Sequence, residues 1–206
     1  MPSPPYSVEE PRLSPRWVAL EGIVGSGKTT TAEIIGAKLG VPTVLEPSAK
    51  HPFLDAYYED PSRFALETEL AFMALHLHQF KQSEHQGELI TDFAPSKDLL
   101  FAELVLSGSD LDLLEAVNTH LWHERPIPSL VLFLDPPVTE CIRRIRSRGR
   151  AYEQSLGEAD LEQLRNKYLA GLGRLGAEVF RVVLDGSESR EHVASRALDR
   201  VARPGT

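Results

Sequence analysis

Residues 17–31 read WVALEGIVGSGKTTT. An apolar strand pattern leads directly into Gly-x-x-x-x-Gly-Lys-Thr, from Gly22 to Thr29, and a helical pattern follows. Glycines leave the backbone free of Cβ atoms, so successive N–H groups can surround phosphates at the positive end of that helix. We expect Lys28 to reach the β- and γ-phosphates and the Thr29 hydroxyl to ligate Mg²⁺. The predicted triphosphate site consists of Gly22, Gly25, Ser26, Gly27, Lys28, Thr29 and Thr30.

Strand and helix patterns alternate along the rest of the chain. Strands are predicted at residues 17–20, 43–45, 89–91, 130–134 and 179–184. Helices are predicted at residues 29–39, 61–86, 97–106, 111–123, 137–148, 160–175 and 189–201. This alternation predicts an α/β fold with a five-stranded parallel sheet covered by helices on both faces. In open sheets of this kind, ligands bind at the carboxyl ends of the strands.

The composition excludes several classes of protein. A chain of 206 residues suits one α/β domain, and no apolar run approaches the length of a membrane span. The single cysteine excludes an internal disulfide and indicates a reducing compartment such as the cytoplasm. The net charge of −8 argues against a nucleic-acid polymer as the main partner, because binding its phosphates would need a surplus of Lys and Arg.

Two carboxylates follow predicted strands, at the edge of the sheet where the phosphate loop should lie. Transfer of a phosphoryl group to a hydroxyl needs a group that orients the nucleophile and accepts its proton, so Glu46 is our candidate general base. Asp92 stands where a Mg²⁺-holding carboxylate of the Walker B kind is expected. The alternatives are that Glu46 caps a turn and that Asp92 caps the next helix.

Five arginines lie within residues 143–150. Arg144 and Arg148 are four residues apart and therefore share one face of a predicted helix, and Arg150 follows the helix-ending glycine. Guanidinium groups can hold phosphate oxygens and stabilise charge during phosphoryl transfer. The alternative is a solvated basic face paired with Glu140 and Glu153.

The predicted helix at residues 61–86 carries an apolar stripe with two polar exceptions. Glu69 and His76 lie within or beside the apolar residues of this stripe. An interior carboxylate is unfavourable unless it meets hydrogen-bond donors. The pair therefore indicates a polar ligand in an otherwise apolar pocket.

Five segments together resemble the deoxyribonucleoside kinase family, which contains bacterial deoxyadenosine and deoxyguanosine kinases and animal deoxycytidine kinase. The segments are residues 22–30, 46–47, 51–64, 91–102 and 141–150. The resemblance implies a P-loop kinase fold with an arginine-rich lid, ATP as phosphate donor and Mg²⁺ as cofactor. The five prolines within residues 1–16 predict a flexible Pro-rich leader at residues 1–15, and the resemblance implies a deoxynucleoside kinase domain at residues 16–206.

The resemblance also implies roles for individual residues. Glu46 should contact the sugar 5′-hydroxyl as base, and Asp92 should help to organise Mg²⁺. Tyr58 and Glu153 match positions that hold the deoxyribose 3′-hydroxyl, and the donor adenine is expected near Asp185. A lid that closes over the donor phosphates and excludes water would be formed by Arg144, Arg148 and Arg150. The groups expected to act on the reacting atoms are Glu46, Lys28, Arg144 and Arg148.

The chain departs from the common family pattern in the acceptor half. Phe93 follows Asp92 where many members have an arginine, and Lys97 is the candidate substitute. His76 stands where an arginine is usual, and Glu69 stands where many members carry a base-reading glutamine. A carboxylate only accepts hydrogen bonds, which matches the adjacent N1–H and 2-amino donors of guanine. Asp98 is also in a base-reading position.

These features predict ATP-dependent 5′-phosphorylation of a purine deoxynucleoside, with deoxyguanosine first, giving dGMP and ADP. Deoxyadenosine or deoxycytidine is the alternative acceptor. A nucleoside monophosphate kinase is less compatible, because it needs basic groups for an acceptor phosphate, and a non-catalytic regulatory subunit is the third alternative. The resemblance implies a homodimer, or else a heterodimer with a related kinase subunit.

Overall fold

The fold is a parallel five-stranded sheet with helices on both faces. The computed structural model describes residues 17–83, 87–174, 178–183 and 188–202. The strands are β1 (Trp17–Glu21), β2 (Thr43–Val44), β3 (Leu89–Thr91), β4 (Leu130–Asp135) and β5 (Glu178–Val183). They lie in the order β2-β3-β1-β4-β5, and all four pairings are parallel. The predicted fold class is confirmed.

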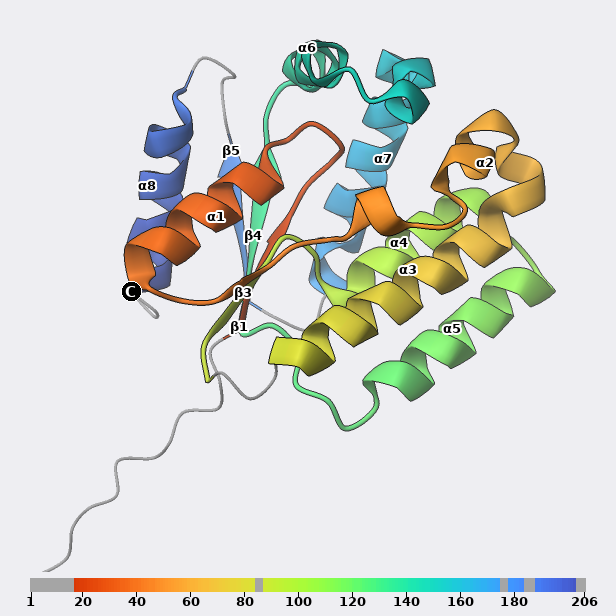
Figure 1. Ribbon diagram of the computed structural model, residues 1–206, viewed down its shortest axis with the longest axis horizontal. Helices are drawn as coiled ribbons and strands as arrows, with labels where there is room; N and C mark the ends of the chain where they lie inside the picture. The colour runs from red at the N-terminus through yellow and green to blue at the C-terminus, as the bar shows by residue number, and fades with distance from the viewer. Residues whose placement is uncertain (1–16, 84–86, 175–177, 184–187, 203–206) are drawn as a thin grey trace, which may run out of the picture.

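The two faces of the sheet are covered differently (Figure 1). Helices α1 (Lys28–Leu39) and α8 (Arg190–Ala202) pack side by side on one face. On the other face lie α4 (Pro95–Val105), α6 (Val138–Arg148) and α7 (Glu158–Gly171). Outside α4 lie α2 (Leu54–Glu59), α3 (Pro61–Ser83) and α5 (Ser109–Trp122). This second, thicker layer carries most of the acceptor half of the candidate site.

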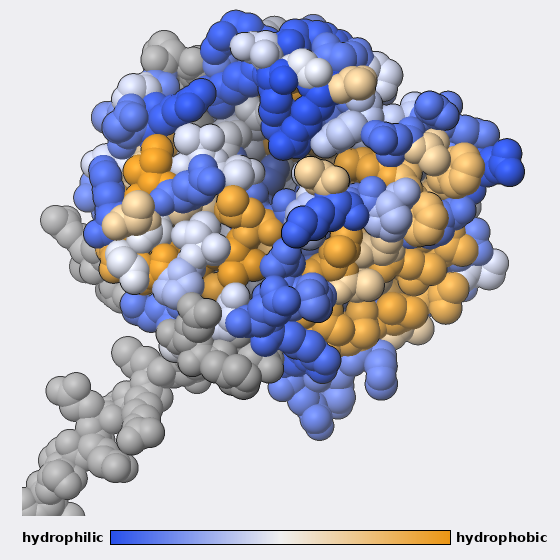
Figure 2. All heavy atoms as spheres, in the orientation of Figure 1, coloured by the Kyte–Doolittle hydropathy of each residue, from blue (hydrophilic) through white to orange (hydrophobic). Residues whose placement is uncertain are grey.

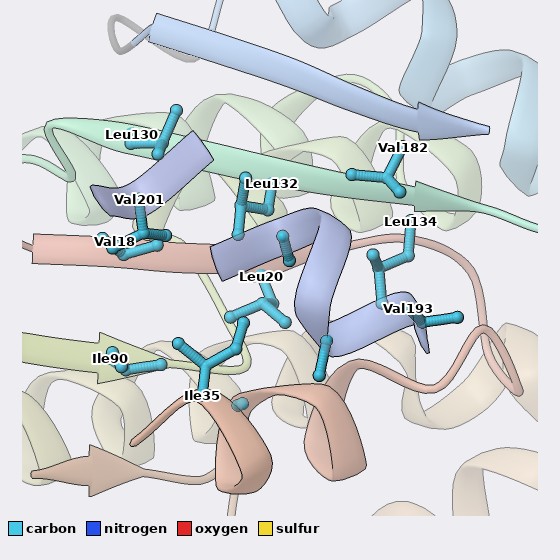
Figure 3. Packing of buried hydrophobic residues seen from close by; sticks show 13 residues of the cluster. Val18, Leu20, Ile35, Ile90, Leu130, Leu132, Leu134, Val182, Val193 and Val201 are labelled. Carbon is cyan, nitrogen blue, oxygen red and sulfur yellow. The ribbon is translucent and has the colours of Figure 1, made fainter. Parts of the chain in front are cut away.

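The core explains why the central strands read as continuous apolar runs. Every residue of β1 and β4 is buried, because both faces of the sheet are covered. On the α1 and α8 side, Leu20 and Leu132 pack with Ile35 of α1 and Val193 of α8 (Figure 3). This core fixes the sheet edge at which the strands end and the site begins.

Some element boundaries differ from the prediction. Helix α4 begins at Pro95 rather than at residue 97, because proline suits the first helical position and the preceding Ala94 is extended. The short helix α2 and the 3₁₀ segments Ser48–Lys50, Ala151–Ser155 and Leu172–Arg174 were not predicted, since each is too short to show a periodic pattern. The predicted leader, the last residues of the predicted helices 61–86 and 160–175, and the end of the predicted strand 179–184 lie outside the described residues. Within the described residues, no helix has the length and apolarity that crossing a membrane requires.

Candidate active site

One cavity at the carboxyl edge of the sheet is lined by most of the predicted acceptor residues, whereas His76 and Arg144 lie outside its lining. Its volume is about 650 Å³, within the range of small-molecule sites. The walls come from the loop after β1, the segment after β2, helices α2, α3, α4 and α7, and the 3₁₀ segment Ala151–Ser155. Among the lining residues are Lys28, Glu46, Tyr58, Glu69, Asp98 and Glu153.

The phosphate loop, residues 22–29, holds its shape through glycine backbone geometry. Gly25 has a φ of +83°, and a Cβ atom there would lie 2.7 Å from the carbonyl oxygen of Cys141 in α6. The Lys28 ammonium donates to the carbonyl oxygens of Gly22 and Ile23 at 2.7 and 3.2 Å. The buried Ser26 hydroxyl has no hydrogen-bond partner among the described residues. A lysine and an unpartnered hydroxyl at the start of α1 fit a phosphate group.

Asp92 connects the phosphate loop to the segment that carries Glu46. Its Oδ2 accepts a hydrogen bond from the Thr29 hydroxyl at 2.5 Å, and its Oδ1 accepts one from the Glu46 backbone N–H at 2.6 Å. Asp92 does not cap α4, whose N-cap residue is Ala94. The carboxylate and the hydroxyl together provide the oxygen ligands that Mg²⁺ prefers.

Two cations hold the Glu46 side chain. Lys97 of α4 and His76 of α3 both contact its Oε2, the histidine at 3.3 Å. Its Oε1 has no hydrogen-bond partner among the described residues. Burial acts to raise the pKa of Glu46, but the charge of Lys97 and the hydrogen bond from His76 outweigh it and hold this pKa well below its usual range. Lys97 thus supplies a cation on the helix that follows Asp92, and its role as a substitute for the missing arginine stays a prediction.

Glu69 and Asp98 form an acidic part of the cavity, and no cation pairs with Glu69 among the described residues. Glu69 is 4% exposed, and its carboxyl group has no hydrogen-bond partner among the described residues. Burial, reinforced by the negative charge of Asp98, raises the pKa of Glu69 to about 8. Asp98 Oδ1 accepts a hydrogen bond from His76 at 2.8 Å, whereas Asp98 Oδ2 is buried without a partner in the described chain. Both carboxyl groups therefore retain hydrogen-bonding capacity that a ligand in the cavity could use.

Aromatic side chains also line the cavity. The Tyr58 ring of α2 stacks on Tyr152 with 5.4 Å between centroids, and Tyr57 meets Tyr58 edge to face. Burial, and then the negative charge of Glu153, raises the pKa of the Tyr58 hydroxyl, so it remains a neutral donor. Glu153 is 3% exposed and follows Tyr152 directly.

The arginines of α6, and Arg150 just after it, are already engaged with acidic partners. Arg148 and Arg150 pair with the two oxygens of Glu153, and Arg144 pairs with Glu140 at 2.7 Å. Arg144 also donates to the carbonyl oxygen of Ser26 at 3.1 Å, which places its guanidinium beside the phosphate loop. The arginines therefore form the ion pairs with Glu140 and Glu153 that the alternative of a solvated basic face predicted. The pairs with Glu153, however, line the cavity.

The structure adds one residue that the sequence analysis missed. Glu21 ends β1, is 1% exposed, and accepts hydrogen bonds from the Ala94 backbone at 2.6 Å and the Tyr168 hydroxyl at 3.0 Å. Burial raises the pKa of Glu21 to about 7, against the opposing charge of Lys97. The sequence offered one signal for this residue, namely that Glu21 directly precedes Gly22, the first glycine of the phosphate loop. The predicted adenine contact, Asp185, lies outside the described residues.

Sheet order, phosphate loop and the acidic acceptor pocket define a nucleotide-binding protein of the P-loop kinase fold. The family model "Deoxynucleoside kinase" matches residues 18–203, so the chain belongs to the deoxynucleoside kinase family. It is a kinase that transfers phosphate to a nucleoside.

Individual relatives agree with this assignment. Deoxyguanosine kinase of Bacillus subtilis (strain 168) is 27% identical over 198 residues, which cover 90% of this chain and 94% of the relative. Deoxyguanosine kinase of Dictyostelium discoideum is 29% identical over 181 residues, covering 82% of this chain and 63% of the relative. The structure of deoxyadenosine kinase from M. mycoides with bound dATP matches with a TM-score of 0.79 at 22% identity, covering 91% and 100% of the two chains, and supports the fold.

Proposed function

We propose that the protein transfers the γ-phosphoryl group of ATP to the 5′-hydroxyl of a purine deoxynucleoside, with deoxyguanosine as the preferred acceptor. One observation carries the choice of acceptor: the cavity that Glu46 lines also presents Glu69 and Asp98, and among the described residues no cation pairs with Glu69. Carboxylates match the donor edge of guanine and would repel an acceptor phosphate.

The donor half of the site would hold ATP through the phosphate loop. Lys28 exchanges its present carbonyl partners for phosphate oxygens, and the Ser26 hydroxyl gains a partner. Thr29 and Asp92 are the residues that would hold Mg²⁺, together with phosphate oxygens. When bound, Mg²⁺ neutralises charge on the transferred group. The described residues contain no cluster of three or more His, Cys, Asp or Glu side chains that could bind a metal by themselves.

Glu46 would orient the nucleophile. Because both cations contact Oε2, its Oε1 is left to accept a hydrogen bond from the 5′-hydroxyl. The oxygen of that hydroxyl forms a bond to the γ-phosphorus as the bond to the β-phosphate oxygen breaks, ADP leaves, and the hydroxyl proton passes to Glu46. A carboxylate with a low pKa is a weak base, so its larger contribution is to fix the hydroxyl in line.

The lid would bring positive charge to the transferred group. Arg144 already borders the phosphate loop, and Arg148 and Arg150 line the cavity mouth on Glu153. Guanidinium groups stabilise charge on a phosphoryl group in transfer. Glu153 and Tyr58 would hold the 3′-hydroxyl between lid and acceptor pocket.

Glu69 would read the base. Its ionised carboxylate accepts from both N1–H and the 2-amino group of guanine. In its protonated form it offers one donor and one acceptor, as glutamine does, which matches adenine and supports deoxyadenosine as second acceptor. The similarity to deoxyguanosine kinases of Bacillus subtilis and Dictyostelium discoideum supports the same order of preference, with deoxyguanosine before deoxyadenosine.

An apolar surface supports a homodimer. Figure 2 shows apolar side chains gathered over α3 and α5, and Leu113 of α5 is 46% exposed. Leu66 and Leu70 of α3 and Val117 of α5 are only partly buried. A heterodimer with a related subunit would use the same surface, and light scattering of the purified chain separates the two arrangements, since only the homodimer forms without a partner.

The test of the acceptor is a coupled ADP-release assay with the four common deoxynucleosides. We expect the largest kcat/KM with deoxyguanosine, and a Glu69→Gln substitution should shift the ratio toward deoxyadenosine by about tenfold or more. An unchanged ratio would contradict the assignment of Glu69. No activity with any deoxynucleoside would favour a regulatory protein, and activity only with monophosphates would favour a nucleoside monophosphate kinase.

A further inference from the structure

His76 lies between the two functional carboxylates of the acceptor half. It is 0% exposed and does not line the cavity, so it can act on a substrate only through its neighbours. Its Nδ1 lies 2.8 Å from Asp98 Oδ1, and its Nε2 lies 3.3 Å from Glu46 Oε2. Among the described residues, His76 alone hydrogen-bonds to both carboxylates.

The geometry requires a charged ring. A neutral imidazole has one N–H, so one of its nitrogens would turn a lone pair toward a carboxylate oxygen. An imidazolium donates to both. Burial acts to lower the pKa of His76, but the carboxylates of Asp98 and Glu46 outweigh it and raise this pKa to about 9.

Aromatic rings fix the plane of this imidazolium. The Phe93 ring stacks on His76 with 4.2 Å between centroids and an interplanar angle of 13°. Phe72 also stacks on His76, with 5.8 Å between centroids and an interplanar angle of 26°. Ring faces attract a cation, so the stack both stabilises the charge and restricts the ring to the direction that joins the two carboxylates.

A second buried histidine shows that this arrangement is specific. His51 packs on Phe72 at 4.1 Å, yet its nitrogens meet the Thr68 carbonyl oxygen and the Phe53 backbone N–H. Burial lowers the pKa of His51, and no carboxylate hydrogen-bonds to it among the described residues. His51 follows the 3₁₀ segment Ser48–Lys50 and is 9% exposed, so it provides a control histidine that is also buried against Phe72 but lacks the bridge.

We propose that His76 is a positioning residue that links recognition of the nucleobase at Asp98 to the placement of Glu46 against the 5′-hydroxyl. A base that engages the unpartnered Oδ2 fixes the Asp98 carboxylate, the rigid ring transmits that orientation, and Glu46 Oε1 is held in line with the nucleophile. This inference rests on the proposed function, because it assigns a route between two parts of the same acceptor site.

The experiment measures kcat and KM for deoxyguanosine in the full chain. His76→Phe keeps the ring stack and removes both hydrogen bonds, and we expect kcat to fall by ~10 to 100-fold. His76→Arg retains a cation with several donors and should recover most of the loss. His51→Phe should lower the melting temperature and leave kcat within about twofold. If His76→Phe does not fold, His76→Met replaces it, because a thioether fills apolar space and has no hydrogen-bond donor.

The decisive measurement is the effect of Asp98→Asn in two backgrounds. In the wild-type background this substitution should lower kcat as well as raise KM, and in the His76→Phe background it should change KM alone. The inference is overturned if Asp98→Asn changes only KM in the wild type, or if His51→Phe lowers kcat as much as His76→Phe. A wild-type chain inactive with every deoxynucleoside would refute the proposed function itself, and this inference with it.

Discussion

The donor half and the acceptor half of the site are built on different principles. The phosphate loop is one contiguous segment whose function depends on backbone N–H groups and positive φ angles. The acceptor half joins side chains from α2, α3, α4 and the segments after β2 and α6. A phosphate site made of backbone groups binds the same chemical group in many different enzymes. In a site made of converging side chains, a single substitution can change which ligand is preferred. We therefore expect the acceptor half to determine specificity.

The largest effect is expected from removing the negative charge of Glu46, which two cations of the acceptor half contact. Glu46→Gln should lower kcat by ~10² to 10³-fold, because an amide is a poor proton acceptor and no longer attracts Lys97 and His76. The KM for ATP should change little, since the donor half is untouched. Steady-state kinetics with deoxyguanosine and ATP varied separately measure both quantities.

Glu103 offers a matched control. It too is a carboxylate held by two cations, Lys167 and Arg174, and its side chain is 16% exposed compared with 19% for Glu46. It lies outside the cavity. Glu103→Gln should therefore leave kcat within about twofold, because exposed ion pairs contribute little. Equal losses in both variants would show that Glu46 acts through stability rather than chemistry.

A smaller effect is expected from a methyl group added to the donor half. Gly25→Ala places a Cβ atom 2.7 Å from the Cys141 carbonyl oxygen at a φ of +83°, so the loop must move away from α6. The KM for ATP should rise by about tenfold or more, with the preference among deoxynucleosides unchanged. Gly40→Ala is the control, because Gly40 also has a positive φ, +67°, but nothing lies within 4 Å of the added atom. If Gly25→Ala alters base preference, the two halves are not separable.

The same contrast explains what could be predicted from the sequence. The phosphate loop, helix α1 and the sheet follow from local spacing and apolar runs, and the structure confirms them. The contact of Lys97 with Glu46 joins residues 51 positions apart, and the bridge by His76 depends on how α3 packs against α4. Periodicity places these residues on helices but does not give the angle between the helices. The acceptor geometry therefore required the structure.

The smallest expected effect concerns pH. In the site without a nucleoside the pKa of Glu69 is raised to about 8, and the two donors of a bound guanine lower it by favouring the ionised carboxylate. The cost of this ionisation falls as the pH rises through 8. Guanine needs the ionised form, and adenine needs the protonated form. The ratio of kcat/KM for deoxyguanosine to that for deoxyadenosine should therefore increase, by roughly tenfold between about pH 7.5 and 8.5. The groups that act on this titration are Asp98, Lys97, His76, Glu46 and Tyr57.

Glu69→Gln is the matched control for this pH effect, since an amide does not titrate. Taking the ratio of two acceptors cancels changes in Glu46, the lid and the phosphate donor, which affect both nucleosides alike. In the substituted enzyme the ratio should be flat across the same range. A ratio that rises with pH in both enzymes would locate the titration in another group, and a flat ratio in the wild type would show that Glu69 is already ionised and reads guanine at every pH tested.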